Sequence, residues 1–142
     1  MAVQLKRVYE KPSLADGTRV LVDRLWPRGL SKNAARVDAW LRDLAPSDEL
    51  RKWFHARWPE GWPVFRKRYL QELSKPQAAA AVEQLYEFAR TGKLTLLYSS
   101  KNETQNNATV LKELLEGMRK PPSSSGPAKA TATVRRMARR RP

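Results

Sequence analysis

The 142-residue chain has no cysteine and a single histidine, His55. The lack of cysteine excludes a disulfide scaffold, thiolate zinc sites and a cysteine nucleophile. His55 lies among aromatic residues without partners at ligand spacing, so we expect a packed or surface side chain, no metal site and no cofactor. No apolar run approaches the roughly 20 residues of a membrane-spanning helix, and Lys6 and Arg7 argue against a signal peptide. We therefore expect a soluble cytoplasmic protein with no membrane partner.

Acidic residues are missing from the C-terminal part of the chain. The formal net charge is +14, and all 14 Asp and Glu residues lie before residue 119. The end of the chain, PPSSSGPAKATATVRRMARRRP, offers almost nothing to bury, so we expect a domain over residues 1–118 and a disordered basic tail over 119–142. Such a tail gains affinity for nucleic acid by releasing counterions, unless it is only a solubilising extension. The arginines expected to contact nucleic acid are Arg135, Arg136, Arg139, Arg140 and Arg141.

Two short apolar runs each end in polar residues. Val20 to Val22 leads directly into Asp23, and Leu94 to Tyr98 leads into Ser99. Runs of this kind are typical of strands covered on both faces. Helical segments separate them, which predicts an α/β fold with a small, mainly parallel sheet and helices packed on its faces. Right-handed crossovers then bring Asp23 and Ser99 to the same edge of that sheet.

The other elements follow from spacing and capping signals. Residues 3–9 read as the first strand, and Ser31 and Ser47 are suited to capping the N-termini of helices. Residues 37–45 are ambiguous: their apolar spacing is helical, but their length and the following Pro46 favour a strand. Helices are expected over 59–73, from Pro76 to Gly92, and over 106–118.

The polar residues at the two strand ends form the candidate site, because ligands of open α/β sheets bind at the carboxyl ends of strands. The guanidiniums there are suited to binding phosphate or carboxylate, with Asp23 orienting one of them and Trp26 forming an apolar wall. A structural ion pair at the strand end is the alternative. The candidate ligand-binding residues are Asp23, Arg24, Trp26, Arg28, Ser99, Ser100, Lys101 and Asn106.

The sequence assigns no catalytic residue to this site. Ser99 or Ser100 with Lys101 lacks the Gly-x-Ser-x-Gly pattern of a nucleophile elbow, and no glycine-rich phosphate loop is present. Hydrogen bonding to a ligand, or helix capping, is the expected role of these serines. Asn106 and Asn107 begin a helix whose positive end favours an anion, although ordinary capping explains them equally well.

Five tryptophans are dense for this length, and most are expected in the core. Trp58 and Trp62 lie close in sequence to Arg57, Arg66 and Arg68, which suggests an alternative role as a stacking and basic surface for single-stranded nucleic acid.

Three functions fit these observations. The first is binding of a small phosphate- or carboxylate-bearing ligand, with or without catalysis. The second is association with nucleic acid through the tail and a basic surface; a helix-turn-helix built from residues 47–54 and 59–73 fits poorly, because their aromatic faces are needed for packing. The third is a non-catalytic interaction module with a protein partner.

Several motifs in the same order resemble a known family. VLVDRLWPRGLSK, DAWLRDLAPSDELRKWF, WPVFRKRY and LTLLYSSKNETQNNATVL closely resemble the YeaO-like branch of the domain of unknown function 488 family. The resemblance covers roughly residues 3–116 and implies a compact bacterial α/β domain. It implies no particular activity, because the family is named without one.

Two departures from the family pattern bear on function. Wider members often carry cysteines and a Cys-His-Arg-like run after the final strand, where this chain reads LYSSKNETQNN. YeaO-like members commonly have histidine at the position of Gln105, so a proton-transfer role for that histidine does not carry over. The arginine-rich tail lies outside the family domain and resembles an addition.

Overall fold

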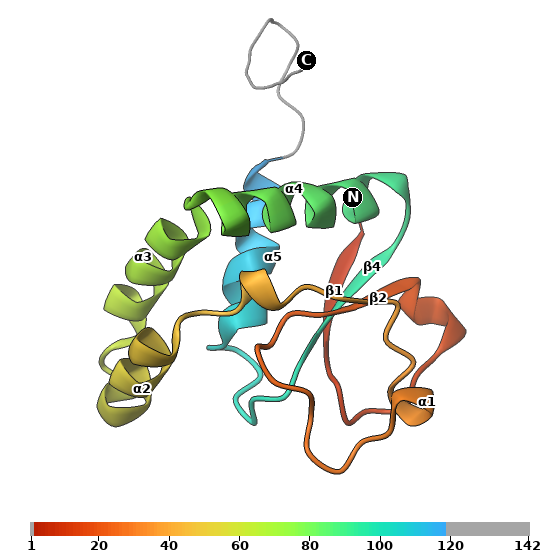
Figure 1. Cartoon of the computed structure of the whole chain (residues 1–142), viewed down its shortest axis with the longest axis horizontal. Coiled ribbons are helices and arrows are strands. Elements are labelled where there is room, and N and C mark those ends of the chain that lie inside the picture. The colour runs from red at the N-terminus through yellow and green to blue at the C-terminus, as the bar shows by residue number, and fades with distance from the viewer. Residues whose placement is uncertain (1, 119–142) are drawn as a thin grey trace, which may run out of the picture.

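A computed structural model describes residues 2–118 (Figure 1), and the tail predicted over 119–142 lies outside the described residues. Four parallel strands form one sheet in the order β1-β4-β2-β3. The strands are β1 (Val3–Arg7), β2 (Thr18–Leu21), β3 (Ala39–Trp40) and β4 (Leu94–Tyr98). The predicted α/β class with a small parallel sheet is confirmed.

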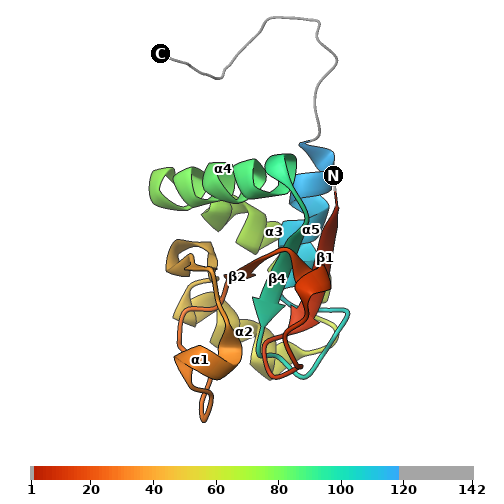
Figure 2. The same ribbon diagram turned by 90° about the vertical axis from the view of Figure 1, so that its right-hand side faces the viewer.

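Helices cover one face of the sheet, and short turns of helix cover the other (Figure 2). The covering helices are α2 (Asp48–Arg57), α3 (Trp62–Leu73), α4 (Pro76–Thr91) and α5 (Asn107–Gly117). The opposite face carries the 3-10 helix η1 (Leu14–Asp16), the loop after β2 and the short helix α1 (Lys32–Ala35). Within residues 2–118, no helix is long and apolar enough to cross a bilayer.

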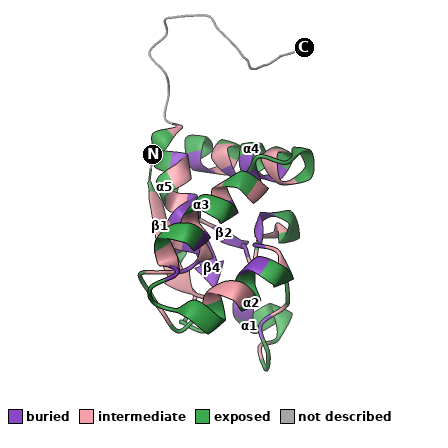
Figure 3. Cartoon of the chain, turned by 90° about the vertical axis from the view of Figure 1, so that its left-hand side faces the viewer, coloured by how far each residue is buried: buried purple, intermediate pink, exposed green. Residues whose placement is uncertain are grey.

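Alternation along the strands divides the buried side chains between two clusters. Val20 of β2 and Leu96 of β4 point to the helices and pack in the main core, which includes Leu85 and Leu111. Figure 3 shows the buried residues along β2, β4 and the inner sides of the helices. The smaller cluster on the opposite face consists of Val8, Leu21 and Leu97, packed against Trp26, Leu30, Val37 and Trp40.

The connections leave neighbouring strands toward opposite faces. The segment after β2 packs on the face of the smaller cluster, whereas α5, which follows β4, packs in the main core. Because β2 and β4 are adjacent, their carboxyl ends form a topological switch point, the place where open parallel sheets bind ligands. The fold thus puts Asp23 and Ser99, which follow these two strands, at the switch point.

An aromatic stack joins α2 and α3 to the sheet. The Phe54 and Phe65 rings stack with centroids 4.6 Å apart, and the Trp62 ring stacks on Phe65 at 5.6 Å. Tyr69 donates a hydrogen bond to the carbonyl of Leu44, and its burial, together with nearby carboxylates, raises the pKa of Tyr69 well above its usual value. The expectation that the aromatic faces of these helices are needed for packing is confirmed, and Trp62, which is partly buried, packs against the main core.

Element boundaries differ from the sequence expectation at three places, the first being β1, which ends at Arg7 instead of Tyr9. Residues 37–45 form a strand over only two residues, because the N–H of Leu41 makes the last bond to β2 and the chain then turns into the 3-10 helix η2 (Arg42–Leu44). The helix expected from Pro59 begins instead at Trp62. Pro59 belongs to the preceding turn, in which its carbonyl accepts the N–H of Trp62 at 3.1 Å.

A buried ion pair that the sequence analysis did not identify holds the amino-terminal end of the sheet. Asp16 and Arg19 are 2% and 4% exposed, and their side chains meet at 2.5 Å. Arg19 also donates to the carbonyls of Ala35 and Arg36, so its guanidinium joins β2 to α1. Burial disfavours the Asp16 carboxylate, but the N–H of Ser13 and the Lys6 and Arg19 side chains outweigh this and hold the pKa of Asp16 below its usual 3.8.

We expect Asp16→Asn to lower the free energy of unfolding at neutral pH by about 3–5 kcal/mol, because Arg19 is then buried without its counter-charge. The wild type has this contribution above pH 3.8 and loses it as the pH falls through the lowered pKa of Asp16. The variant lacks this acid dependence, so the two stabilities converge in acid. Urea unfolding of the wild type and the variant at neutral and acidic pH measures the stability difference and its dependence on pH.

Asp48→Asn is the matched control, since Asp48 pairs with Arg51 at 3.7 Å on the surface. It should cost less than about 1 kcal/mol. A stability difference between Asp16→Asn and wild type that stays constant into acid would contradict the assigned role of the ion pair.

Candidate functional site

The Asp23 carboxylate ties the ends of β2 and β4 to the start of α5. Its Oδ2 accepts the Ser99 N–H at 2.8 Å and the Ser99 hydroxyl at 2.7 Å. Its Oδ1 accepts the Asn107 amide at 3.0 Å, and the same amide donates to the carbonyl of Val22. The predicted meeting of Asp23 and Ser99 at one edge is therefore observed. Within residues 2–118, Asp23 forms these bonds in place of an ion pair with a guanidinium.

The loop after Asp23 is fixed mainly through backbone carbonyls. Arg24 donates to the carbonyl of Pro46 at 3.3 Å, and the Tyr9 hydroxyl donates to the carbonyl of Arg28 at 3.0 Å. Gly29 turns the chain with φ +79°, a value that side-chain-bearing residues rarely adopt. Arg28 is exposed, and its guanidinium makes no ion pair with another residue of the 2–118 range. The loop thus presents a cation on a fixed backbone.

The predicted tryptophan of this loop has a packing role. The Trp26 indole N–H donates to the carbonyl of Leu30 at 2.6 Å, and its ring contacts Trp40 edge-on with centroids 5.4 Å apart. The Trp40 indole N–H in turn donates to the carbonyl of Asp23 at 2.7 Å. The two rings stiffen the loop over the smaller core cluster.

Arg7 adds a cation that the sequence analysis did not assign to the site. Its guanidinium donates to the carbonyls of Ser99 and Ser100 and lies 5.3 Å from the centre of the Tyr9 ring. The position of Arg7 at the end of the first predicted strand was the available signal, because parallel strands end at the same edge. Ser100 Oγ accepts the N–H of Asn102, and Lys101 is exposed without an ion pair in the described part of the chain.

The two asparagines at the start of α5 have different roles. Asn106 is buried, its Oδ1 accepts the N–H of Thr109 at 2.9 Å, and its Nδ2 donates to the carbonyl of Asn102. Its side chain is thus used in capping, the alternative that the sequence left open. Asn107 is the residue that reaches Asp23.

The arrangement is suited to binding charge rather than to acid–base chemistry. The Ser99 hydroxyl donates to a carboxylate that already accepts two other hydrogen bonds, and no histidine contacts either group. His55, the only histidine of the sequence, is exposed on α2. Among residues 2–118, no three His, Cys, Asp or Glu side chains are grouped to hold a metal ion. The exposed charged groups near this edge include the cations Arg28 and Lys101 and the carboxylates of Glu10 and Glu103.

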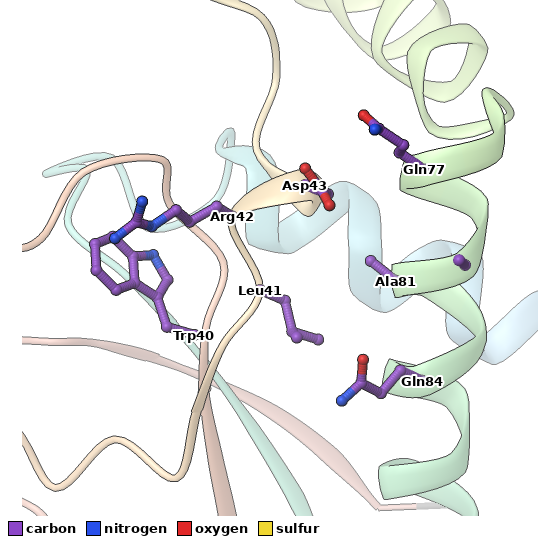
Figure 4. A pocket seen from close by; sticks show the side chains of 8 residues that line it. Trp40, Leu41, Arg42, Asp43, Gln77, Ala81 and Gln84 are labelled. Carbon is purple, nitrogen blue, oxygen red and sulfur yellow. The ribbon is translucent and has the colours of Figure 1, made fainter.

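A groove of about 400 Å³ lies elsewhere, between η2 and α4 (Figure 4). The guanidinium of Arg42 lies over the Trp40 ring at 3.9 Å, on one side of this groove. Its lining residues are Trp40, Leu41, Arg42, Asp43, Gln77, Ala80, Ala81 and Gln84. None of the sequence-predicted site residues lines it.

Comparison with known proteins decides the family. The sequence pattern described as "Inactive DUF488-N3 subclade" matches residues 2–131. The chain belongs to this family. The resemblance to the YeaO-like branch that its motifs indicated is confirmed, and the match to a DUF488-N3 subclade extends past the boundary predicted at residue 118.

Curated DUF488 relatives cover most of the chain. The uncharacterized protein YeaO of Escherichia coli (strain K12) is 44% identical over 118 residues, which are 83% of this chain and all of that protein. The uncharacterized protein Rv3073c of Mycobacterium tuberculosis (strain H37Rv) is 41% identical over 117 residues, which are 81% of this chain and 94% of that protein. No solved structure matches significantly.

The structure gives Gln105 a contact of its own. Its Oε1 accepts the indole N–H of Trp58 at 3.0 Å, joining the loop before α5 to the end of α2. Gln105 is therefore a hydrogen-bond acceptor that positions a tryptophan.

Asp23→Ala should lower the free energy of unfolding by about 2–4 kcal/mol, since it leaves the Ser99 N–H and the Asn107 amide without their acceptor. Ser99→Ala removes only one hydroxyl bond and should cost about 1 kcal/mol. Denaturant unfolding measures these costs. Unfolding of Asp23→Ala, Asn107→Ala and the double variant gives the Asp23–Asn107 coupling, which we expect to be about 0.5–3 kcal/mol. Strictly additive costs would show that the Asp23–Asn107 contact contributes nothing.

Proposed function

We propose that this protein is a non-catalytic anion-binding domain that takes a small phosphate- or carboxylate-bearing ligand at the carboxyl ends of β2 and β4. The observation that carries the proposal is the presence of exposed cations, Arg28 and Lys101, on loops that leave this switch point. Arg24, Ser100 and Arg7 border the same edge, and Trp26 supports the loop.

The proposal omits catalysis for two reasons. Asp23 and Ser99 bind each other and Asn107, so neither is a free base or a free nucleophile. The description of the matched subclade begins with the word "Inactive", which agrees with a site that binds without turning over. Asp23, Ser99 and Asn106 then hold the loops in place, and the cations contact the ligand.

The ligand is inferred to be anionic from the balance of charge at this edge. The Asp23 carboxylate is covered by donors and the Glu10 carboxylate accepts the N–H of Arg7, whereas Arg28 and Lys101 have no ion pair in the described part of the chain. Glu103 is a further exposed carboxylate at this edge. A guanidinium binds a phosphate or carboxylate through two parallel hydrogen bonds, and a lysine adds a flexible point charge. A neutral ligand would leave both charges unused.

Arg28→Ala and Lys101→Ala should each weaken binding of a phosphate-bearing ligand by about tenfold, because each removes a charge-assisted hydrogen bond of about 1.5 kcal/mol or more. Isothermal titration of the full-length protein with inorganic phosphate and nucleoside monophosphates measures this. Arg90→Ala is the control, since Arg90 is exposed on α4 and pairs with Glu87. Equal losses in all three variants would indicate only a general charge effect.

The sequence favours a second function, association with nucleic acid through the basic tail. The tail carries eight Lys and Arg residues and no acid. Arg135, Arg136, Arg139, Arg140 and Arg141, which lie outside the described residues, are proposed to contact phosphates without reading sequence. The division of the chain at residue 118 and a cytoplasmic location stay predictions.

Replacing these five arginines by serine in the full-length protein should reduce the slope of log affinity for duplex DNA against log salt by up to about 4.5, if each releases one counterion. Binding at several salt concentrations measures the slope. An unchanged slope and affinity would show that the tail takes no part in binding.

A further inference from the structure

An exposed tryptophan at the end of α2 is held by a residue from a distant loop. Trp58 is 51% exposed, the only tryptophan among the exposed large hydrophobic residues of the 2–118 range. Its indole N–H donates to Gln105 Oε1 at 3.0 Å, so the ring orientation is fixed although much of its surface stays in water. A ring held in this way is preorganised for stacking on a planar partner, because the side chain loses little conformational freedom on binding.

Cations surround a second tryptophan on the same pair of helices. The guanidiniums of Arg57, from α2, and Arg68, from α3, each lie 4.8 Å from the Trp53 ring centre. A Cβ atom on Gly61 would lie 3.2 Å from the Trp53 ring and 3.1 Å from the Arg57 side chain, so a glycine permits this close packing. Arg57 directly precedes Trp58 in the chain, while its guanidinium lies over the Trp53 ring.

The charges of this group are not neutralised by the protein. Arg66 on the same helix pairs with Glu113 at 2.8 Å, but neither Arg57 nor Arg68 has a carboxylate partner within residues 2–118. Arg57 donates only to the backbone carbonyl of Trp53. The remaining N–H groups of both guanidiniums are available to an anion, while stacking on Trp53 restricts their movement.

An exposed indole at the end of a helix pair that carries guanidiniums without ion pairs matches the chemistry of one class of partner. Single-stranded nucleic acid offers unpaired bases that stack on aromatic rings and phosphates that pair with arginine. A duplex keeps its bases stacked, and an acidic peptide needs no aromatic face. A membrane is disfavoured, since Val64 is the only other large hydrophobic side chain of α2 and α3 that is exposed.

We propose that Trp53, Arg57, Trp58 and Arg68 form a binding surface for single-stranded nucleic acid, the Trp58 surface. An unpaired base stacks on the Trp58 indole, and the guanidiniums of Arg57 and Arg68 contact the flanking phosphates. Gln105 positions the indole. This surface shares no residue with the small-ligand site at Arg28 and Lys101, so the variants of each site test it independently.

The test uses the full-length protein and measures fluorescence anisotropy of labelled oligothymidylate, oligouridylate and a matching DNA duplex. Trp58→Ala should weaken single-strand binding at least about fivefold, the lower end of base–aromatic stacking, and leave duplex binding unchanged. Elevated salt reduces the contribution of the tail and keeps the difference measurable. If Trp58→Ala weakens binding to oligothymidylate alone, the preferred partner is DNA. If it weakens binding to oligouridylate alone, the preferred partner is RNA.

Controls separate stacking from folding and from general charge. Trp58→Phe keeps an aromatic face and should retain most of the binding, and Leu14→Ala, at a fully exposed apolar residue, should retain all of it. Arg68→Ala should weaken single-strand binding more than Arg90→Ala, which removes the same charge from α4. Circular dichroism confirms that each variant is folded.

Three results would overturn the proposal. The first is unchanged single-strand affinity in folded Trp58→Ala. The second is an equal loss on single strands and duplex. The third is Trp58-dependent binding to anionic phospholipid vesicles together with no Trp58-dependent binding to oligonucleotides.

Discussion

The structure depends on one carboxylate at the point where two neighbouring strands end. Asp23 accepts hydrogen bonds from the backbone and side chain of Ser99 and from the amide of Asn107. In a parallel sheet the chain leaves each carboxyl end for a different part of the fold, and here β2 and β4 send it to opposite faces. Without a link between the two strand ends, the positions of the following loops relative to each other would not be fixed. Asp23 supplies that link, and the positions of Arg28 and Lys101 follow from it.

Charged residues in this domain fall into two groups with different consequences. Asp16, Arg19 and Asp23 are buried or partly buried, and each is covered by hydrogen bonds or by opposite charge, as the cost of burying ions requires. Arg28 and Arg68 are exposed without carboxylate partners in the described part of the chain. The first group holds the sheet at both of its ends, and the second group leaves positive charge on the surface, on which the proposed anion binding rests.

Much of the fold was predictable from the sequence, because apolar runs and capping residues are local signals. Leu94 to Tyr98, and the Ser47 cap of α2, were identified in this way. The meeting of Asp23 with Ser99 followed from the handedness of crossovers. Three features needed tertiary structure: the Asp16–Arg19 pair, the choice between Asn106 and Asn107, and the contact of Trp58 with Gln105. Trp58 with Gln105 and Asn107 with Asp23 join segments far apart in the chain, and burial of the Asp16–Arg19 pair depends on α1, whose end supplies carbonyl acceptors to Arg19. The packing of Trp62 against the core likewise depends on Phe54 of another helix.

Hydrogen exchange at the backbone N–H of Ser99 tests the role of Asp23 most directly. This N–H follows the last residue of β4, and its bonding partner is the carboxylate of another strand end. If Asp23 ties the strand ends together, the Ser99 N–H exchanges only through openings as rare as those of β4, and in Asp23→Ala it becomes fast while the N–H of Leu97 stays protected. Fast exchange at Ser99 in the wild-type protein, at the rate of an open loop, would contradict this account.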